Sequence, residues 1–118
     1  MSSGIRNVIS DNIVNNASDT GITIGSDSFD NTIMNNSLTL CTPAGIPLQD
    51  SGRNRILGNT ISNGGIEAYV DSEGRDGFIG NMIRNMGTNG FELRGATRMM
   101  FLGNRIQDNS GNGIRLTQ

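Results

Sequence analysis

Short segments of alternating apolar and polar residues recur along the whole chain. Each segment is about three to five residues long, its apolar residues lie two positions apart, and Gly, Asn, Asp or Ser bounds it. A spacing of two is the period of a β-strand, and the bounding residues are typical of turns. No window of about ten residues shows the spacing of a helix. The pattern therefore predicts an all-β chain of short strands and tight turns.

The segments form a repeat of three parts. The phrase Asn-x-(Ile/Val)-x-Asn begins at Asn12, Asn31, Asn59 and Asn81, and a variant that ends in Asp begins at Asn104. The phrase Gly-(Ile/Phe)-x-apolar follows each copy and begins at Gly21, Gly45, Gly65, Gly90 and Gly113. An apolar pair precedes most copies, as in Ile56-Leu57, Phe78-Ile79 and Phe101-Leu102. A unit of about 23 residues cannot enclose a core alone, but copies stacked in phase share one.

The repeat therefore predicts a right-handed parallel β-helix of about five coils with three short strands per coil, as one domain over residues 1–118. One interior ladder is predicted to contain Val14, Ile33, Ile61, Ile83 and Ile106. A second is predicted to contain Ile22, Ile46, Ile66, Phe91 and Ile114. The repeated Asn residues suit left-handed turns and amide ladders between coils. Coil two, with more residues before its Gly, is predicted to carry an extra loop within Ser37 to Ala44, around Cys41 and Pro43.

The amino-acid composition excludes some kinds of catalytic site and disfavours some kinds of partner. Of the 118 residues, 47 are Asn, Gly or Ile; His, Lys and Trp are absent, and all nine basic residues are Arg. A His base or His–metal site is therefore excluded. The net charge of −2 and the scattered Arg residues disfavour a nucleic-acid partner. The apolar runs are too short for a membrane span. Cys41 is expected to be a small apolar residue without an intramolecular disulfide.

The Asn-x-Ile-x-Asn and Gly-Ile-x-Leu phrases resemble those of the pectin-lyase-like superfamily of right-handed β-helices, over residues 4–117. Members include pectate lyases, polygalacturonases, alginate epimerases and phage tailspike depolymerases. The resemblance implies an elongated polysaccharide bound along one face. The His-containing motif of the epimerases and the Asp and Arg pattern of calcium-dependent pectate lyases have no counterpart here. Catalytic members are several times longer, so the resemblance also implies a piece of a larger protein or assembly.

The candidate site follows from the third strand of the repeat. Glu67 and Glu92 lie between two inward-facing apolar residues, so both should point outward, and Arg115 takes the same place in the next coil. Glu67 and Glu92 are the candidate catalytic residues, and at a coil spacing of about 5 Å one of their pKa values should rise, opposed by Arg115. The predicted substrate-binding residues are Tyr69, Asp71, Glu73, Arg75, Asp76, Arg94, Arg98 and Arg115. No metal site or cofactor is expected, although a bound cation such as calcium is compatible with the row that contains Glu67 and Glu92.

Two functions and a simpler alternative remain open from the sequence. The first is polysaccharide recognition with chemistry, as a lyase, epimerase or glycoside hydrolase. The second is a non-catalytic segment for glycan binding or trimer assembly in a tailspike-like or cell-surface fibre. In the simpler alternative, the outward-facing charged residues only keep the chain soluble. Unpaired edges at both ends of the stack predict a homo-oligomer or contact with flanking sequence. No signal peptide is recognisable near Met1. An extracellular or virion-associated location is consistent with the hypothesis of a tailspike-like or cell-surface fibre.

Overall fold

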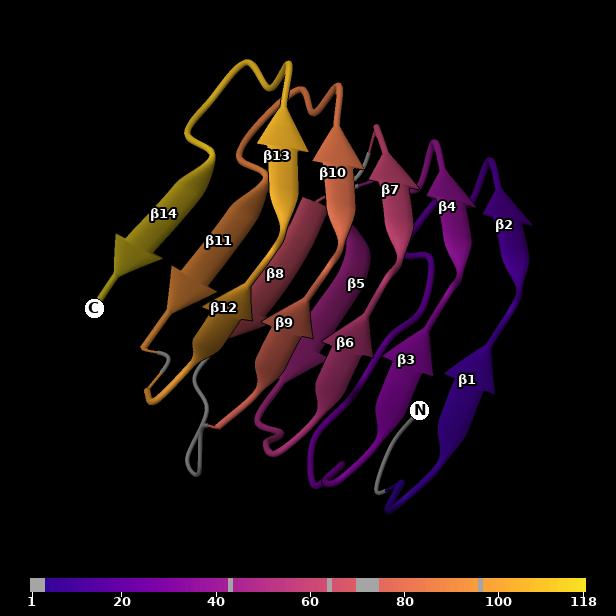
Figure 1. Ribbon diagram of the computed structural model, residues 1–118, viewed down its shortest axis with the longest axis vertical. Helices are drawn as coiled ribbons and strands as arrows, with labels where there is room; N and C mark the ends of the chain where they lie inside the picture. The colour runs from indigo at the N-terminus through magenta and orange to yellow at the C-terminus, as the bar shows by residue number, and fades with distance from the viewer. Residues whose placement is uncertain (1–3, 43, 64, 70–74, 96) are drawn as a thin grey trace.

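The computed structural model describes residues 4–42, 44–63, 65–69, 75–95 and 97–118, with the backbone alone for residues 65–69. Short parallel strands wind into a solenoid with three sheets (Figure 1). The first sheet contains β1 (Val8–Ser10), β3 (Thr32–Met34), β6 (Arg55–Leu57), β9 (Gly77–Ile79) and β12 (Met100–Leu102). The second contains β2 (Ile13–Asn15), β4 (Ser37–Thr39), β7 (Thr60–Ser62), β10 (Met82–Arg84) and β13 (Arg105–Gln107). The third contains β5 (Ala44–Gln49), β8 (Gly65–Tyr69), β11 (Phe91–Arg94) and β14 (Ile114–Thr117).

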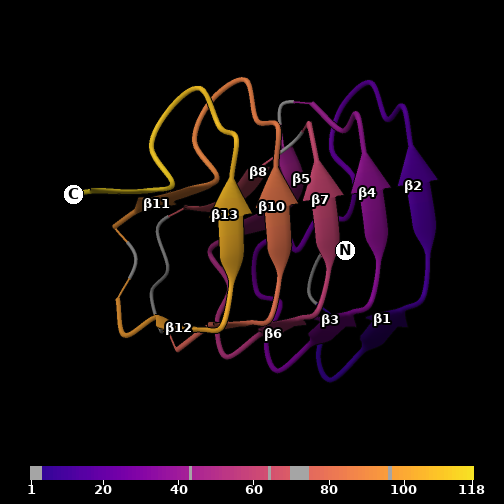
Figure 2. The ribbon, with the colours of Figure 1, turned by 45° about the horizontal axis from the view of Figure 1, so that its top comes forward.

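This arrangement confirms the predicted all-β parallel solenoid, with a number of coils close to five. The three sheets lie on different sides of a common interior (Figure 2). One residue of each short strand points inward, and inner-coil residues such as Ile56, Ile61 and Ile83 have no exposed surface. Phe78, Phe91 and Phe101 pack together in this interior with ring centroids 5.0–5.3 Å apart. The core is therefore a continuous apolar column built from one or two residues per strand.

Coil two differs from the predicted alignment. Because β3 pairs with β1 and β6, Ile33 stacks between Ile9 and Ile56 in the first sheet. The strand that pairs with β2 is β4, so Leu38 takes the place predicted for Ile33 beside Val14. Each of the first three coils contains two successive five-residue units with an inward Asn and then an apolar residue two positions later. A slip of one unit therefore leaves the pattern unchanged, which made the prediction for Ile33 wrong.

The same slip produced the predicted extra loop in coil two. Ser37–Thr39 is strand β4, Ala44 begins β5, and Cys41 is buried. With Asn36 rather than Asn31 matched to Asn12, successive coils are 24, 23, 22 and 23 residues long. Pro43 lies outside the described residues. The second predicted ladder is confirmed in register, since Ile46, Ile66, Phe91 and Ile114 are direct partners, and Ile22 donates its N–H to the carbonyl of Gly45.

Two ladders of inward-facing amides join the coils. In the longer one, Oδ1 of each Asn accepts both the backbone N–H and the Nδ2–H of the Asn one coil earlier, at 2.9–3.1 Å. Its members are Asn12, Asn36, Asn59, Asn81 and Asn104. Each Nδ2 from Asn36 onward also donates to a backbone carbonyl of the preceding coil. Nearly every polar atom of these side chains is thereby paired inside the solenoid, as burial requires.

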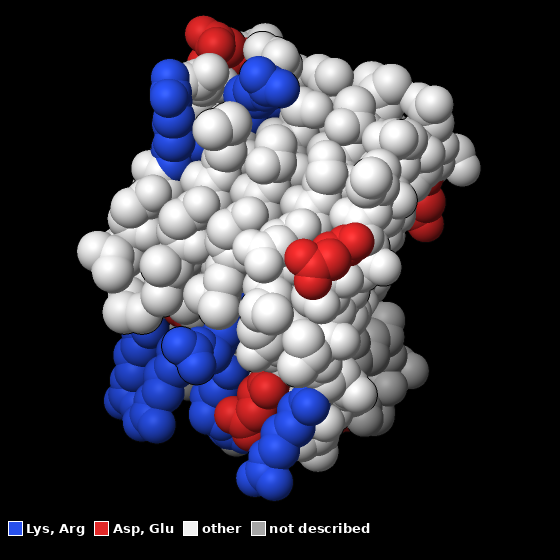
Figure 3. All heavy atoms as spheres, turned by 45° about the vertical axis from the view of Figure 1, so that its right-hand side comes forward, with Lys and Arg blue, Asp and Glu red and all other residues white. Residues whose placement is uncertain are grey.

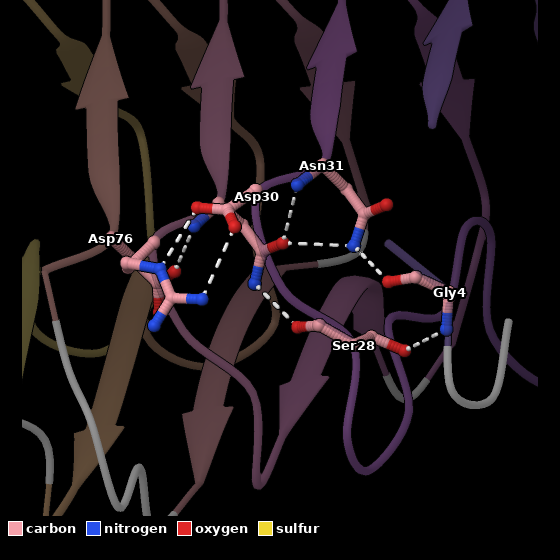
Figure 4. A network of polar contacts seen from close by, with 7 residues as sticks. Gly4, Ser28, Asp30, Asn31 and Asp76 are labelled. Atoms are coloured by element: carbon pink, nitrogen blue, oxygen red, sulfur yellow. Dashed lines mark hydrogen bonds and ion pairs between the residues drawn. The ribbon is translucent and has the colours of Figure 1, made fainter. Parts of the chain in front are cut away.

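The second ladder lies one five-residue unit earlier. Asn7 donates to Asn31. Asn31 in turn donates to Asn54, and the backbone N–H of Asn54 donates to Oδ1 of Asp76 at 2.7 Å (Figure 4). Asn31 and Asn54 also donate through Nδ2 to the carbonyls of Gly4 and Ser28. A carboxylate therefore stands in the ladder where the other described members are amides.

Replacement of a central core residue tests the register. Ile83 is fully buried between Ile61 and Ile106, so Ile83→Ala should lower the free energy of unfolding by about 2–5 kcal/mol through lost burial and a residual cavity. Chemical denaturation measures this change. Ile13→Ala, at a residue that is 76% exposed, is the matched control and should change stability by less than about 1 kcal/mol. Equal effects of the two variants would contradict the assignment of the inward face.

Removal of a ladder amide tests the polar part of the interior. Asn59→Ala leaves the backbone N–H of Asn36 without its acceptor. It also removes one donor each from the Ile33 carbonyl and from Asn81 Oδ1, which keeps the backbone N–H of residue 59. Buried polar groups left unpaired cost about 1–3 kcal/mol each, so the melting temperature should fall sharply. The control is Asn12→Ala in the outermost coil, where the side chain is exposed. A loss for Asn59→Ala no larger than for Asn12→Ala would show that the ladder contributes little.

Candidate functional site

The predicted row of charged residues on the third sheet is present in the backbone register. Glu92 on β11 lies opposite Glu67 on β8 and opposite Arg115 on β14. The three residues are therefore neighbours on successive coils, as the repeat predicts. The side chain of Glu67 lies outside the described residues, so the predicted carboxylate pair is present as a register position and Glu92 is its described member.

Glu92 is the centre of an ion cluster. Its Oε1 accepts hydrogen bonds from Nη2 and Nε of Arg94 at 2.7 and 3.0 Å, and Arg115 Nη1 lies 3.7 Å away. Its Oε2 accepts from Nδ2 of Asn89 at 3.1 Å. The two guanidinium groups cover the carboxylate, so that the Glu92 side chain is only 12% exposed whereas those of Arg94 and Arg115 are about half exposed.

These contacts set the charge of Glu92. The hydrogen bond from Arg94 is the main cause that lowers the pKa of Glu92 below its ordinary value, with smaller contributions from Asn89 and Arg115 and an opposing one from burial. The like-charge effect that we expected to raise a pKa in this row is therefore not what governs Glu92. A general acid must hold a proton at the working pH, so Glu92 is unsuited to that role.

The residues predicted to bind substrate between Tyr69 and Asp76 differ in where they lie. Asp71, Glu73 and the side chain of Tyr69 lie outside the described residues. Asp76 is buried, with 1% of its surface exposed, and belongs to the second ladder. It therefore does not face a ligand, contrary to the prediction, because the inward-facing position of the repeat places it inside the solenoid. Arg75 comes directly before Asp76 and is exposed.

Arg75 and Arg98 occupy the same corner of successive coils. The corner precedes the first sheet, and its residues, Arg6, Asp30, Arg53, Arg75 and Arg98, all have φ between 56° and 68°. Backbone hydrogen bonds from Arg6 to Phe29, from Asp30 to Gly52 and from Arg75 to Thr97 stack the corners one coil apart. We call this row the arginine corner.

Two members of the arginine corner form an ion pair. Arg53 donates from Nε and Nη2 to the two oxygens of Asp30 at 2.8 and 3.1 Å (Figure 4). The hydrogen bond from Arg53 is also the main cause that lowers the pKa of Asp30. The Arg53 guanidinium lies 5.1 Å from the centre of the half-buried Phe29 ring. No ion pair to Arg75 or Arg98 is found within the described part of the chain.

The sequence analysis did not single out Arg6, Asp30, Phe29 and Arg53. The signal was available, since each charged residue comes directly before an inward Asn, as in Arg6-Asn7 and Arg53-Asn54. The prediction missed this signal because it placed only one five-residue unit in each coil. On the face that Figure 3 shows, Arg side chains lie near the top and bottom edges with acidic side chains beside them, and mostly uncharged residues, with a few acidic ones, cover the area between.

Neither a metal site nor a membrane span follows from the described residues. Among them, no three Cys, Asp or Glu side chains lie close enough together to hold a metal ion. No described helix has the length and hydrophobicity that a bilayer crossing requires.

The titration of Glu92 tests the ion cluster. Because its pKa is lowered in the folded protein, Glu92 should stay ionised through mildly acidic pH, and the stability it contributes should be lost only as the pH falls through the lowered value. Carboxyl-carbon NMR should place its midpoint below 4.5. Arg94→Gln should raise the midpoint, and Arg84→Gln, on another sheet, should not. A midpoint above 4.5 in the parent protein would contradict the cluster.

Comparison with known proteins agrees with the geometry. The family model described as a right-handed β-helix region matches residues 32–118, about three quarters of the chain. Neither the comparison with curated proteins nor that with solved structures gives a match. The finer resemblance to polysaccharide lyases and tailspikes therefore stays a prediction. The match and the parallel solenoid together show that this chain belongs to the right-handed β-helix family.

Proposed function

We propose that the chain is a recognition module that binds an elongated acidic polysaccharide along the arginine corner. The chain as a whole carries a net charge of −2, yet four of the five residues at this corner are Arg. A polymer of sugar acids offers carboxylates at regular intervals, and guanidinium groups bind carboxylates through paired hydrogen bonds. Rows of equivalent side chains one coil apart, about 4.8 Å, suit a ligand that is itself a repeat.

Backbone geometry carries the proposal. Positive φ is unfavourable for residues with long side chains, whereas Gly, Asn and Asp tolerate it. Two other repeated corners obey this rule in nine of ten positions, with Leu40 as the exception. They are Asp11, Asn35, Gly58, Gly80 and Gly103, and Asn16, Leu40, Asn63, Asn85 and Asp108. The arginine corner breaks the rule four times, and strained residues of this kind are more frequent at functional sites.

Binding is better supported than cleavage. Hydrolysis of a glycosidic bond by the usual mechanism needs one protonated carboxyl group beside a second carboxylate. Glu92 is held ionised by Arg94, and Asp30 by Arg53. In the row on the third sheet, Glu92 therefore holds Arg94 and Arg115 in place as two further cations rather than acting on the substrate.

Binding to polygalacturonate and alginate tests the proposal, with neutral dextran as the negative control. The double variant Arg75→Asn/Arg98→Asn should bind at least tenfold more weakly by titration calorimetry. Its stability should stay the same or rise by about 1 kcal/mol, because Asn suits the left-handed corner better than Arg. The matched variant Arg84→Asn/Arg105→Asn removes two exposed Arg residues from the second sheet and should change binding less than twofold.

Three results would overturn the proposal. The first is failure of the parent chain to bind either acidic polymer. The second is an equal loss of binding in both double variants. The third is release of unsaturated products or new reducing ends that Glu92→Gln abolishes, which would make Glu92 catalytic after all. Added salt should weaken the binding, since exposed charges are screened.

A further inference from the structure

The two end faces of the solenoid differ in their hydrogen-bonding groups. Between the ends of the longer ladder, each Oδ1 accepts from the Asn of the coil before it, while the backbone N–H and one Nδ2–H donate to the Asn of the coil after it. At the face formed by the first coil, no described group donates to Oδ1 of Asn12. At the opposite face, no described acceptor meets the backbone N–H of Asn104, whose Nδ2 donates only to the Phe78 carbonyl. One face therefore offers an acceptor and the other offers donors.

The apolar column also opens at both faces. The face of the last coil has a hollow lined by Phe101, Leu102, Gly103, Asn104, Ile106 and Ile114. Leu116, an inward position of the repeat, is 73% exposed there. On the first coil, Ile9 and Val14 are only partly buried. Ile9 belongs to the same ladder as Phe101, and Val14 to the same ladder as Ile106.

We propose that the last-coil face of one molecule docks on the first-coil face of a second copy, continuing both the amide ladder and the apolar column. Asn104 then donates to Asn12 Oδ1 of the second copy, as Asn81 donates to Asn104 within the chain. Val14 of the second copy covers Ile106, and Ile9 covers Phe101. A second copy is the occupant because its first coil has the pitch, the acceptor and the apolar positions that this face lacks.

The contact is directional, since the same face does not fit itself. At the amide ladder, two last-coil faces would bring the donors of Asn104 against each other, and two first-coil faces would bring the Oδ1 acceptors of Asn12 against each other. Head-to-tail contacts of this kind extend into rows or filaments unless the geometry closes a ring. The molecule's extents of 31 × 30 × 26 Å limit each face to less than about 1,000 Å², close to one partner's share of a standard interface. We therefore expect association that depends on concentration.

Stacking also places Arg98 of one copy beside Arg6 of the next, because both belong to the arginine corner. Like charges repel, and salt screens exposed charges. Added salt should therefore strengthen the association of copies. This response is opposite to that expected for glycan binding, so the two proposals fail or succeed separately.

Two variants block the faces one at a time. Since Ser37 N–H bonds to the Asn12 carbonyl, strand alternation turns the Ile13 N–H to the open edge, and Ile13→Pro removes that donor from the first-coil face. Leu116→Asp places a charge on the last-coil face that docking would bury. Ile13→Ala, which keeps the N–H, and Leu40→Asp, at an exposed leucine of an inner coil, are the matched controls.

Light scattering and sedimentation across protein concentration give the result. The parent chain and both controls should form a series of oligomers, whereas Ile13→Pro alone and Leu116→Asp alone should each stay monomeric. A mixture of the two should form one-to-one dimers, since each supplies the face that the other lacks. A monomeric parent at millimolar concentration overturns the proposal and indicates that other sequence covers the face. So does association of either blocked variant alone, or a mixture that does not pair, provided that circular dichroism shows both variants folded.

Discussion

The inward amides of the two ladders are the constraint on which the rest of the structure depends. A buried amide must satisfy two donors and an acceptor, and here the partners lie one coil before and one coil after. Asn59 meets this demand with Asn36, Ile33 and Asn81. Within a five-residue unit the requirement fixes the register of each coil on the next, since an amide out of place would leave buried polar groups unpaired.

The ladder positions in turn determine the corners. The residue directly before an inward Asn must turn the chain, and it does so with positive φ at Arg6, Asp30 and Arg53 as at Gly58 and Gly80. At most corners the side chain suits the turn. At the arginine corner it does not, so the turn is formed at a local cost and presents a row of long cationic side chains. The turn itself therefore does not require a charged residue, because Gly forms the equivalent turn at Gly58 and Gly80.

Polarity along the stack follows from the same bonds. Each inner Asn of a ladder accepts through Oδ1 from the Asn of the coil before it and donates to the ladder residue of the coil after it, so the solenoid has distinct faces even though its coils are similar. Within the row on the third sheet, the ion cluster around Glu92 shows how neighbouring coils also couple electrostatically. Glu92 holds Arg94 and, from the next coil, Arg115 near its carboxylate. The pKa of Glu92 is lowered mainly by Arg94 of the same strand, and Arg115 of the next coil adds a smaller contribution.

The sequence by itself determined the strands, the parallel stacking, the second interior ladder and the outward position of Glu92. These depend on residue spacing, which is visible in one dimension. It did not determine which five-residue unit stacks on which, because Ile33 and Leu38 occupy identical local patterns, and only pairing with β1 or β2 distinguishes them. Nor did it show that Asp76 is buried or that the pKa of Glu92 is lowered. Asp76 meets Asn54, 22 positions away, only because the chain winds into stacked coils. The pKa of Glu92 depends mainly on Arg94, two positions along the same strand, and to a smaller extent on Arg115, which the winding brings from the next coil.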